Sequence, residues 1–505
     1  MQTAELARHL LGVNFQDADA ILLFRESEGV PLFIVEMANT GIGVDTVRKI
    51  DSDLPEKDPE ASKIGMPPRL KAILERHLTR LSSPARAVIE SAAVLGREFD
   101  FGLLKMVSEF DEGATVNALD ELWRLRLMRE RGGRYDFSHD KLRETTLSGI
   151  SPIRLRWLHQ RAGETLESQP GGAEYARIAN HFVQADLPTK AAGAYALAAS
   201  QANRIFAFAD ALEHLQNAAR LEKDRATLAN LKEERGNLLK MLDKREEAYE
   251  AYSQALGLSL DKLQRARLNR NQSTLKGRFE TDTAREKYHA ALDELNRAQN
   301  DSGYWHEWID LQLSWIEICY WMQDAKTIDS LLEQVKQPVE QHGTVLQKIM
   351  YRYRLISSAF VNEKFYLNQS HVVLARETML LAIELNNPFQ VSNAKRQLGM
   401  VELFAGQLDA AETTFREAIA LCEKNNDMNS MLIARAYLSY TYRRQRKLQD
   451  LIIETGFLEN LLGQVSANPA YQGLVNANRA WLAWLEGDHK QARQLAQTAL
   501  DIWQS

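Results

Sequence analysis

The chain has 505 residues, enough for three or four domains, and its 26% charged and 45% hydrophobic residues are ordinary for a soluble globular protein. A net charge of -6 excludes a broadly basic protein built to bind nucleic acid or an anionic membrane. The apolar runs are too short to span a bilayer, and the two cysteines are too far apart for a metal motif, so we expect a reduced, cytoplasmic setting and no metal.

The first 66 residues predict a helical segment followed by a linker. In residues 1–45 the apolar positions, such as Leu6 and Leu10, recur at helical spacing, so we expect two or three helices. The pattern lapses over residues 46–66, where the charged and proline-broken run Asp51–Pro59 indicates an exposed linker.

Residues 67–150 predict a small domain of three helices and a β-hairpin. Ser82-Ser83-Pro84 is typical of a helix start, and Gly96 is a suitable end for that helix. Two segments of alternating polarity flank Gly132-Gly133, and a glycine pair in this position favours a tight hairpin turn. Three helices and a hairpin predict a winged helix, and residues 151–204 are expected to form connecting helices.

Beyond residue 150 the chain carries an internal repeat. Each copy has a small residue, a usually larger residue four positions later, and a small residue three positions after that. Neighbouring copies are separated by 36 or 37 residues, with longer gaps that fit more than one period. In one such gap, Trp305–Val335 predicts a further, degenerate helix pair. The copies are Ala211-Leu215-Ala218, Ala248-Tyr252-Ala255, Ala284-Tyr288-Ala291, Ala375-Met379-Ala382, Ala411-Phe415-Ala418 and Ala492-Ala496-Ala499.

The repeat has a physical reason. Two antiparallel helices approach closely only where small side chains face each other, and a larger residue then fills the groove of the neighbouring helix. A small residue lies twelve positions ahead of several copies, at Gly236, Gly399 and Ala480. One helix pair cannot bury its own apolar face, so pairs stack. We therefore predict an all-α fold, apart from the hairpin, with a right-handed superhelix of about seven to nine repeats over residues 205–505.

The chain carries no recognisable catalytic motif. It contains no phosphate-binding Gly-x-x-x-x-Gly-Lys loop, no His-Glu-x-x-His or Cys-x-x-Cys metal motif, and no Gly-x-Ser-x-Gly nucleophile elbow. We therefore expect neither catalysis nor a cofactor of its own in these residues. An unrecognised enzyme is the least favoured alternative.

Four segments carry a family resemblance. Gly29-Val30-Pro31 resembles the Gly-x-Pro segment in the helical lid of STAND ATPases, the signal-transduction ATPases with numerous domains. Pro67–Ser82 and Ala92–Phe99 are similar to the winged helix of that family. Phe137-Ser138-His139-Asp140 resembles its Met-His-Asp motif, with Phe-Ser ahead of the histidine in place of methionine. Residues 175–505 resemble tetratricopeptide repeats, which bacterial members of this family use as sensor arrays.

The resemblance implies a nucleotide switch in the parent protein. Gly29 and Pro31 would border the adenine of ATP or ADP, and His139 would face the β-phosphate of ADP and hold the switch shut. The ATPase core, which would carry the phosphate loop, is expected ahead of Met1, so this chain alone should bind ATP weakly or not at all. From the residues alone, a histidine such as His139 is more often a core or capping residue, and Pro31 is equally compatible with a proline at a helix start.

The resemblance also implies a function. The chain would be the non-catalytic sensor part of an ATP-dependent signalling or transcriptional regulator, similar to maltose-activator-type regulators and cyclase-associated ATPases. Its repeats would bind a protein or small inducer, and its winged helix would relay that event to an ATPase core in cis or in trans. The alternative is a free-standing tetratricopeptide scaffold. Direct binding of nucleic acid is not expected, because Asp120 and Glu121 lie beside Arg124 on the third helix of the winged helix.

Two further features have two interpretations each. Trp305, Trp308 and Trp315 share one helical face, which predicts either packing between helices or a platform that binds a partner. The basic run Arg443–Lys447 predicts either a solvated helix end or a grip on an acidic partner.

Overall fold

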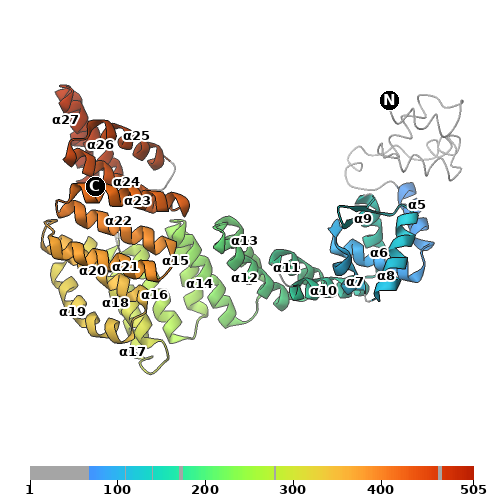
Figure 1. The fold of residues 1–505 in the computed structure, drawn as a ribbon. Helices are drawn as coiled ribbons and strands as arrows, with labels where there is room; N and C mark the ends of the chain where they lie inside the picture. The colour runs from blue at the N-terminus through green and yellow to red at the C-terminus, as the bar shows by residue number, and fades with distance from the viewer. Residues whose placement is uncertain are drawn as a thin grey trace, which may run out of the picture. The chain divides into compact units, whose positions relative to one another are not determined.

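The computed structural model describes residues 68–504 apart from 109, 139, 170–173, 278–279 and 464–468. The predicted lid and linker, residues 1–66, lie outside these described residues. The described part contains 23 helices and three short strands, which confirms the predicted all-α class with one small sheet. Figure 1 shows the chain, which divides into two compact units after Glu222, and the predicted start of the repeats at residue 205 falls inside the first unit.

The described residues of the first unit form nine helices and three strands. These are α5 (Pro68–Thr79), α6 (Ser83–Leu95), β1 (Glu98–Phe99), α7 (Phe101–Ser108), α8 (Glu112–Arg124), β2 (Met128–Arg131), β3 (Arg134–Phe137), α9 (Asp140–Gly149), α10 (Pro152–Ser168), α11 (Tyr175–Gln184), α12 (Pro188–Arg204) and α13 (Phe208–Leu221). Helix α6 is central to this unit, because nine of its 13 residues are buried, and Val88 and Ile89 are completely buried.

The predicted ends of α6 are confirmed. The hydroxyl of Ser82 accepts a hydrogen bond from the amide of Ala85 at 3.3 Å, and a proline occupies the first turn, where its missing N–H is not needed. The helix stops at Gly96, whose φ of 120° is strained for a residue with a side chain. Local chemistry therefore defines both ends of the helix.

The predicted hairpin is also present, within a sheet of strand order β1-β3-β2. Met128 pairs with Phe137 and Arg131 with Arg134, all antiparallel. Gly132 and Gly133 both have positive φ, 59° and 79°, as a turn of the I′ type requires. The sequence pattern did not predict β1, α7 or α9, because elements of two to ten residues carry too little periodicity.

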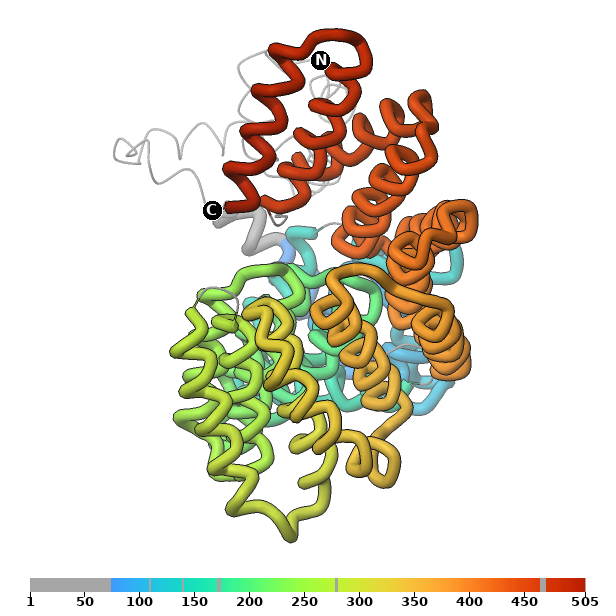
Figure 2. The backbone as a smooth tube through the Cα atoms, turned by 90° about the vertical axis from the view of Figure 1, so that its left-hand side faces the viewer, coloured from blue at the N-terminus to red at the C-terminus, as the bar shows by residue number. Residues whose placement is uncertain are grey.

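The second unit is a run of helix pairs. Figure 2 shows its tube folding back on itself from α14 to α27. The helices are α14 (Arg225–Met241), α15 (Arg245–Leu258), α16 (Lys262–Lys276), α17 (Thr281–Asn296), α18 (Tyr304–Trp321), α19 (Ala325–His342), α20 (Val345–Asn362), α21 (Gln369–Glu384), α22 (Pro388–Phe404), α23 (Leu408–Lys424), α24 (Met428–Gln445), α25 (Leu448–Leu462), α26 (Pro469–Leu485) and α27 (His489–Gln504). The degenerate pair predicted over Trp305–Val335 corresponds to α18 and α19.

The interlock predicted within each pair is confirmed at two positions. A Cβ added to Gly236 on α14 would lie 2.5 Å from the ring of Tyr252 on α15, and one added to Gly399 on α22 would lie 2.8 Å from the ring of Phe415 on α23. Both rings are fully buried. Each aromatic residue therefore occupies the space that the absent side chain of the facing helix leaves free.

The last copy of the repeat departs from the prediction. Ala492 and Ala499 are buried, but Ala496 is exposed, so no central residue of this copy fills a groove. On α27 the indole of Trp503 takes this role instead. A Cβ added to Gly473 on α26 would lie 2.5 Å from the Nε1 of this indole, and the same N–H donates a hydrogen bond to the carbonyl of Ala470 at 3.0 Å.

The turns within the pairs share a left-handed residue. Gly406 between α22 and α23 has a φ of 81°, and Gly487 between α26 and α27 has a φ of 88°. The corresponding residues of other pairs, Asp243, Gln323 and Arg446, have φ values of 55°, 57° and 62° although they are not glycines. The tight turn is therefore a feature of the repeat that the stacking of the helices imposes.

Helix pairing begins earlier than predicted. In the first unit, a Cβ on Gly163 of α10 would lie 2.7 Å from the ring of Phe182 on α11, which is the same interlock as in the repeats. The residues predicted as connecting helices, 151–204, thus already contain a pair of this kind. The repeat pattern does not reveal this pair, because its trio, Ile178-Phe182-Ala185, begins with isoleucine and not with a small residue.

Candidate functional site

The residues predicted to contact nucleotide cannot be placed. Gly29, Pro31 and His139 lie outside the described residues, so their roles stay predictions. The two neighbours of His139 are described. Ser138 donates its amide to the carbonyl of Leu127 at 3.0 Å, and Asp140 begins α9. The predicted nucleotide-sensing position therefore comes directly after the hairpin.

Of the three tryptophans of the predicted platform, Trp315 lies in the core. Trp315 is only 7% exposed and stacks on Tyr288 with ring centroids 4.5 Å apart. Trp308 is partly buried against the same cluster, and Trp305 is 40% exposed and stacks on His342 at 4.9 Å. Packing between helices, the alternative interpretation, describes Trp315, while partner binding at Trp305 and Trp308 stays a prediction.

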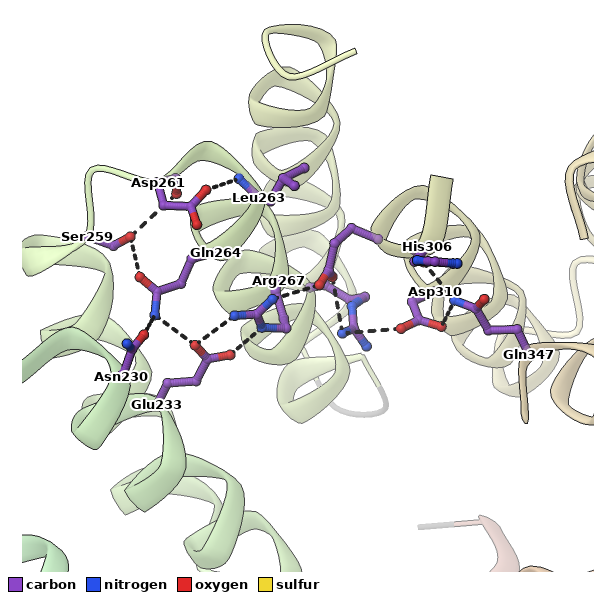
Figure 3. Close-up of polar contacts among 12 residues, drawn as sticks. Asn230, Glu233, Ser259, Asp261, Leu263, Gln264, Arg267, His306, Asp310 and Gln347 are labelled. Carbon is purple, nitrogen blue, oxygen red and sulfur yellow. Dashed lines mark hydrogen bonds and ion pairs between the residues drawn. The ribbon is translucent and has the colours of Figure 1, made fainter. Parts of the chain in front are cut away.

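A ladder of polar side chains crosses the first helices of four successive pairs (Figure 3). We call it the polar ladder. It comprises Asn230 and Glu233 on α14, Gln264, Arg267 and Arg270 on α16, His306, Glu307 and Asp310 on α18, and Gln347 on α20. Its contacts link residues 34, 40 and 37 positions apart, which are single steps of the repeat.

The ladder centres on Arg267. This guanidinium contacts Glu233 on the preceding pair at 3.1 Å and Glu307 on the following pair at 2.7 Å. Glu233 also accepts a hydrogen bond from the amide of Gln264 at 2.9 Å. These hydrogen bonds to two carboxylates raise the pKa of Arg267 against the opposing effect of burial. Arg267 is therefore a permanent cation held between two acids.

The far end of the ladder is joined by amides and carboxylates. Asp310 accepts a hydrogen bond from the Gln347 amide at 2.8 Å, and the same amide also donates to the carbonyl of His306 at 2.8 Å. Arg270 lies 3.6 Å from Glu307 and 3.8 Å from Asp310. Acids and bases alternate along the ladder and link successive pairs, although the Nε of Arg270 and the Oε2 of Glu307 are buried without a hydrogen-bond partner.

A second surface, on later first helices, has a different character. We call it the aromatic–arginine face. It comprises Tyr320 on α18, Arg396 and Phe404 on α22, Tyr437, Tyr440 and Arg443 on α24, and Tyr471 on α26. All seven residues are half-buried, so each keeps part of its surface available to solvent. Tyrosine and arginine are the residue types that most often contribute binding energy at protein interfaces.

The rings of this face contact one another. The ring centroid of Phe404 lies 6.4 Å from that of Tyr437 and 6.3 Å from that of Tyr440. The guanidinium of Arg443 lies 4.9 Å from the centre of the Tyr440 ring. Tyr471 packs against the same apolar cluster as Tyr437. The face is therefore one continuous surface across three helix pairs.

Electrostatic coupling extends the face to an earlier pair. Burial raises the pKa of Tyr320, and Tyr471 raises it further although it lies four helix pairs later, on α26. Burial also raises the pKa of Tyr437, with contributions from both of those tyrosines, while Arg396 opposes the shift. First helices that are far apart in sequence are thus near one another, as expected for a superhelix.

The arginines of the aromatic–arginine face lack acidic partners. No carboxylate of the described residues lies within 4.0 Å of the guanidinium nitrogens of Arg396 or Arg443. Arg396 contacts the side chains of Asn393 and Met400, and its Nε is buried without a hydrogen-bond partner. Burial lowers the pKa of Arg443, while the side chain of Tyr440 opposes this shift.

The predicted basic run has mixed roles. Helix α24 ends within it, and Arg446 is the left-handed residue of the turn, as a helix end requires. Lys447 pairs with Glu412, while Arg444 donates to the carbonyl of Leu403 at 3.2 Å. The helix-end interpretation is confirmed for these residues, and Arg443 alone turns toward the aromatic rings.

Two arginines, Arg161 and Arg177, join the α5–α9 region to the first helix pair, and a third, Arg143, makes a similar contact within that region. Arg143 on α9 donates to the carbonyl of Ala93, and Arg177 on α11 donates to that of Leu95, at 2.8 and 2.7 Å, at the end of α6. Arg161 on α10 donates to the carbonyl of Val107 at the end of α7. Cations at helix C-termini satisfy otherwise unpaired carbonyls and interact favourably with the helix dipole. We call Arg161 and Arg177 the arginine clamps.

Beside the clamps lies a pair of histidines, of which His181 is buried and His159 half-buried. The Nδ1 atoms of His159 on α10 and His181 on α11 are 3.0 Å apart. Burial lowers the pKa of His159 to about 4, with a contribution from Arg143, and burial lowers that of His181 to about 3, with contributions from His159 and Arg177. Both imidazoles are therefore neutral at physiological pH, and one donates its proton to the other.

Neither a metal site nor a reactive thiol emerges from the described residues. No group of three or more His, Cys, Asp or Glu side chains in this part of the chain is arranged to hold a metal ion. Burial raises the pKa of both Cys319 and Cys422 to about 11, so these thiols are protonated and unreactive. Within the same residues no helix combines the length and the apolar character that crossing a bilayer needs.

Comparison with known proteins gives a likeness of fold. No protein-family model matches the chain, and no curated protein matches it. Among solved structures, it is similar to a STAND protein with a tetratricopeptide repeat sensor from Pyrococcus horikoshii, with 12% identity and a TM-score of 0.57 over 98% of this chain and 72% of that one.

Two further solved structures are similar over part of the chain. A Rap protein complexed with competence and sporulation factor has 14% identity and a TM-score of 0.41 over 62% of this chain and 87% of that one. The Cut9–Hcn1 hetero-tetramer of the APC/C has 13% identity and a TM-score of 0.30 over 72% and 76%. We base the comparison of folds on the Pyrococcus horikoshii protein. The chain is thus an all-α helical-repeat protein with the fold of a STAND protein that carries a tetratricopeptide repeat sensor.

The aromatic–arginine face was not predicted from the sequence, although a signal exists. Arg396, Tyr437 and Tyr471 occupy first helices at separations of 41 and 34 residues, about one repeat each. The repeat pattern consists mainly of small residues on the second helices, which mark the interlocks. It contains no polar or aromatic positions of the first helices, so it does not reveal this face.

Proposed function

We propose that the chain is the sensing and relaying part of a STAND-type, ATP-dependent regulator. The second unit would bind a partner protein, and the first unit would pass that event to an ATPase core. The observation that carries this proposal is the likeness of fold to a STAND protein with a tetratricopeptide repeat sensor, over 98% of the chain. The order of the proposed winged helix, the His139 position and the helix pairs supports it.

The partner-binding surface would be the aromatic–arginine face. Its residues are half-buried, and among the described residues its two arginines have no carboxylate within 4.0 Å, whereas Arg267 and Arg270 of the polar ladder lie beside acids. A benzoylphenylalanine crosslinker at Tyr437 should therefore capture the partner in cells. The same crosslinker at Leu380, a 57% exposed residue on the second helix α21, is the matched control and should not capture it. Equal capture from both positions would contradict this assignment.

The relay would run through the arginine clamps. Arg161 and Arg177 bind the ends of α7 and α6 directly to the first helix pair, so a displacement of α10 and α11 would pull on the α5–α9 region, the part of the sequence in which His139 falls. An imidazole can donate a hydrogen bond to phosphate and so couple this region to a nucleotide. In this proposal, ATP or ADP is bound by the parent protein, with His139 at its β-phosphate and Gly29 and Pro31 at the adenine.

The switch is tested by the nucleotide content of the parent protein. Purified full-length protein should retain ADP, and the His139→Ala variant should lose it. Ser138→Ala, next to it, is the matched control and should retain nucleotide. If the His139→Ala protein kept both its ADP and its regulatory output, the free-standing scaffold would become the better account of this chain.

A further inference from the structure

The aromatic–arginine face carries an electrostatic imbalance that its packing does not explain. Several arginines on the first helices of this unit are paired with acids, while Arg225 and Arg444 bind backbone carbonyls instead. Arg267 contacts Glu233 and Glu307, and Arg435 contacts Glu454 at 2.8 Å. Arg396 has no such partner, although a cation that is removed from water without an acid is costly.

The surroundings of Arg396 are also incompletely satisfied. Its own Nε is buried without a hydrogen-bond partner, and so is the hydroxyl of Tyr353 on α20, a residue only 3% exposed. Arg396 is near enough to Tyr353 to oppose the rise in pKa that burial causes there. Tyr353 belongs to the same buried cluster as Ala394, two residues before Arg396. Two unsatisfied polar groups on neighbouring first helices thus lie close together.

A second unpaired cation lies on the next first helix. Arg443 sits over the ring of Tyr440 at 4.9 Å, and burial lowers its pKa. The rings of Phe404 and Tyr437 line the surface beside Tyr440. The arrangement offers two guanidinium groups and an aromatic surface beside them, while the described residues supply no acid to either guanidinium.

We propose that the aromatic–arginine face binds an acidic segment of a partner protein, with one carboxylate of that segment paired to Arg396, a second near Arg443, and apolar side chains against Phe404, Tyr437 and Tyr440. The proposal rests on the proposed function, because it specifies the chemistry of the partner that the repeats would bind. A planar guanidinium matches a carboxylate with two parallel hydrogen bonds, and an already desolvated cation gains most from such a partner.

The test uses fluorescein-labelled peptides and the intact chain. A short peptide of alternating glutamate and tyrosine should bind, measured by fluorescence anisotropy, and its glutamine–tyrosine analogue should bind at least about tenfold more weakly. Arg396→Gln should weaken binding of the glutamate peptide by about tenfold and leave the glutamine peptide unchanged. Arg352→Gln, which removes a half-exposed arginine paired with Glu377 at 3.1 Å, is the matched control and should have no effect.

Two further variants separate recognition from folding. Arg396→Gln should unfold at the same or a higher urea concentration than the wild type, because it removes an unpaired cation, whereas a purely structural arginine would make the variant less stable. Arg396→Glu should reverse the preference, so that a lysine–tyrosine peptide binds more tightly than the glutamate peptide. Loss of folding in both variants would overturn the proposal.

Other outcomes would also overturn it. Equal binding of the glutamate and glutamine peptides would show that the face does not recognise the charge of the peptide. If Arg352→Gln weakened binding of the glutamate peptide as much as Arg396→Gln does, the attraction would be a general effect of positive charge and not of a specific site. Tighter binding of a labelled oligothymidine, with the same dependence on Arg396, would assign the face to phosphates instead. If the crosslinker at Tyr437 still captured a protein in any of these cases, the acidic partner would be wrong while the proposed function stood. Failure of the crosslink as well would remove both.

Discussion

Replacing Gly399 by alanine should destabilise the second unit, although the same change stabilises most helices. In an ordinary helix interior, alanine is favoured over glycine by about 1 kcal/mol. At Gly399, however, the new Cβ would lie 2.8 and 2.9 Å from two ring atoms of Phe415, closer than real Cβ atoms come to a neighbour. Phe415 is fully buried, so its ring has no free space to move into.

The two effects have opposite signs. Overpacking a close-packed core costs about 1–3 kcal/mol, and subtracting the gain in helix propensity leaves a net loss of about 1 kcal/mol. Gly456 on α25 is the matched control, because it is exposed, helical and has no atom within 4 Å of its added Cβ. Gly456→Ala should therefore gain about 0.5–1 kcal/mol, and the two variants should differ by about 2 kcal/mol.

The assay is urea unfolding followed by far-ultraviolet circular dichroism. Replacing the ring by a smaller aliphatic side chain should relieve the clash, so Phe415→Leu should cost less in the Gly399→Ala background than in the wild type. If Gly399→Ala and Gly456→Ala stabilised the protein equally, the interlock between α22 and α23 would not be as tight as the structure shows, and the physical reason given for the repeat would be wrong.

Three further changes test other parts of the account. Gln323→Gly, at a turn with φ of 57°, should stabilise the protein by about 1 kcal/mol in the same unfolding assay, whereas Gly406→Ala, at φ of 81° with open space around it, should destabilise it by about that amount. The pKa values of His159 and His181 are lowered to about 4 and about 3 in the folded protein, so between pH 6.5 and 5 these histidines bind protons only in the unfolded chain. Lowering the pH through this window should therefore lower the free energy of unfolding, and by less in a variant with glutamine at both positions. Arg177→Met should cost about 1–3 kcal/mol by leaving a helix-end carbonyl unpaired, and it should speed hydrogen exchange at the end of α6.

These three predictions have clear controls. Gly193→Ala, at an exposed helical glycine with no neighbour within 4 Å, is the control for the turn variants and should be mildly stabilising. Arg156→Met, at an exposed arginine on α10, is the control for Arg177→Met and should leave exchange in α6 unchanged. A pH profile that is identical with and without the two histidines would show that they titrate normally in the folded state.

Much of the fold could be predicted because its causes are local or periodic. Ser82 and Gly96 specify the ends of α6 by capping chemistry, and the glycine pair specifies the hairpin turn. The small residue at Gly399 and the ring at Phe415 recur at the spacing of the repeat, so their contact follows from periodicity. Short elements such as β1 carry no periodic signal and become ordered only by pairing with β3.

The candidate site could not be predicted, because it depends on distance in space. Arg396 lacks an acidic partner because no carboxylate of the described residues lies near it in the folded chain, and a sequence does not show such distances. Trp315 illustrates the converse, since a tryptophan on an apparent binding face proved to stack on Tyr288 inside the core. The residues predicted to contact nucleotide, His139 among them, stay predictions.

The central claim is that occupation of the second unit is felt at the nucleotide through the arginine clamps. The most direct measurement is the rate at which fluorescent ADP leaves the full-length protein, with and without saturating partner captured through Tyr437. The account predicts that the partner accelerates release, and that the acceleration is lost in an Arg161→Met/Arg177→Met variant which still binds the partner. An unchanged release rate on partner binding, or an acceleration that survives loss of both clamps, would contradict it.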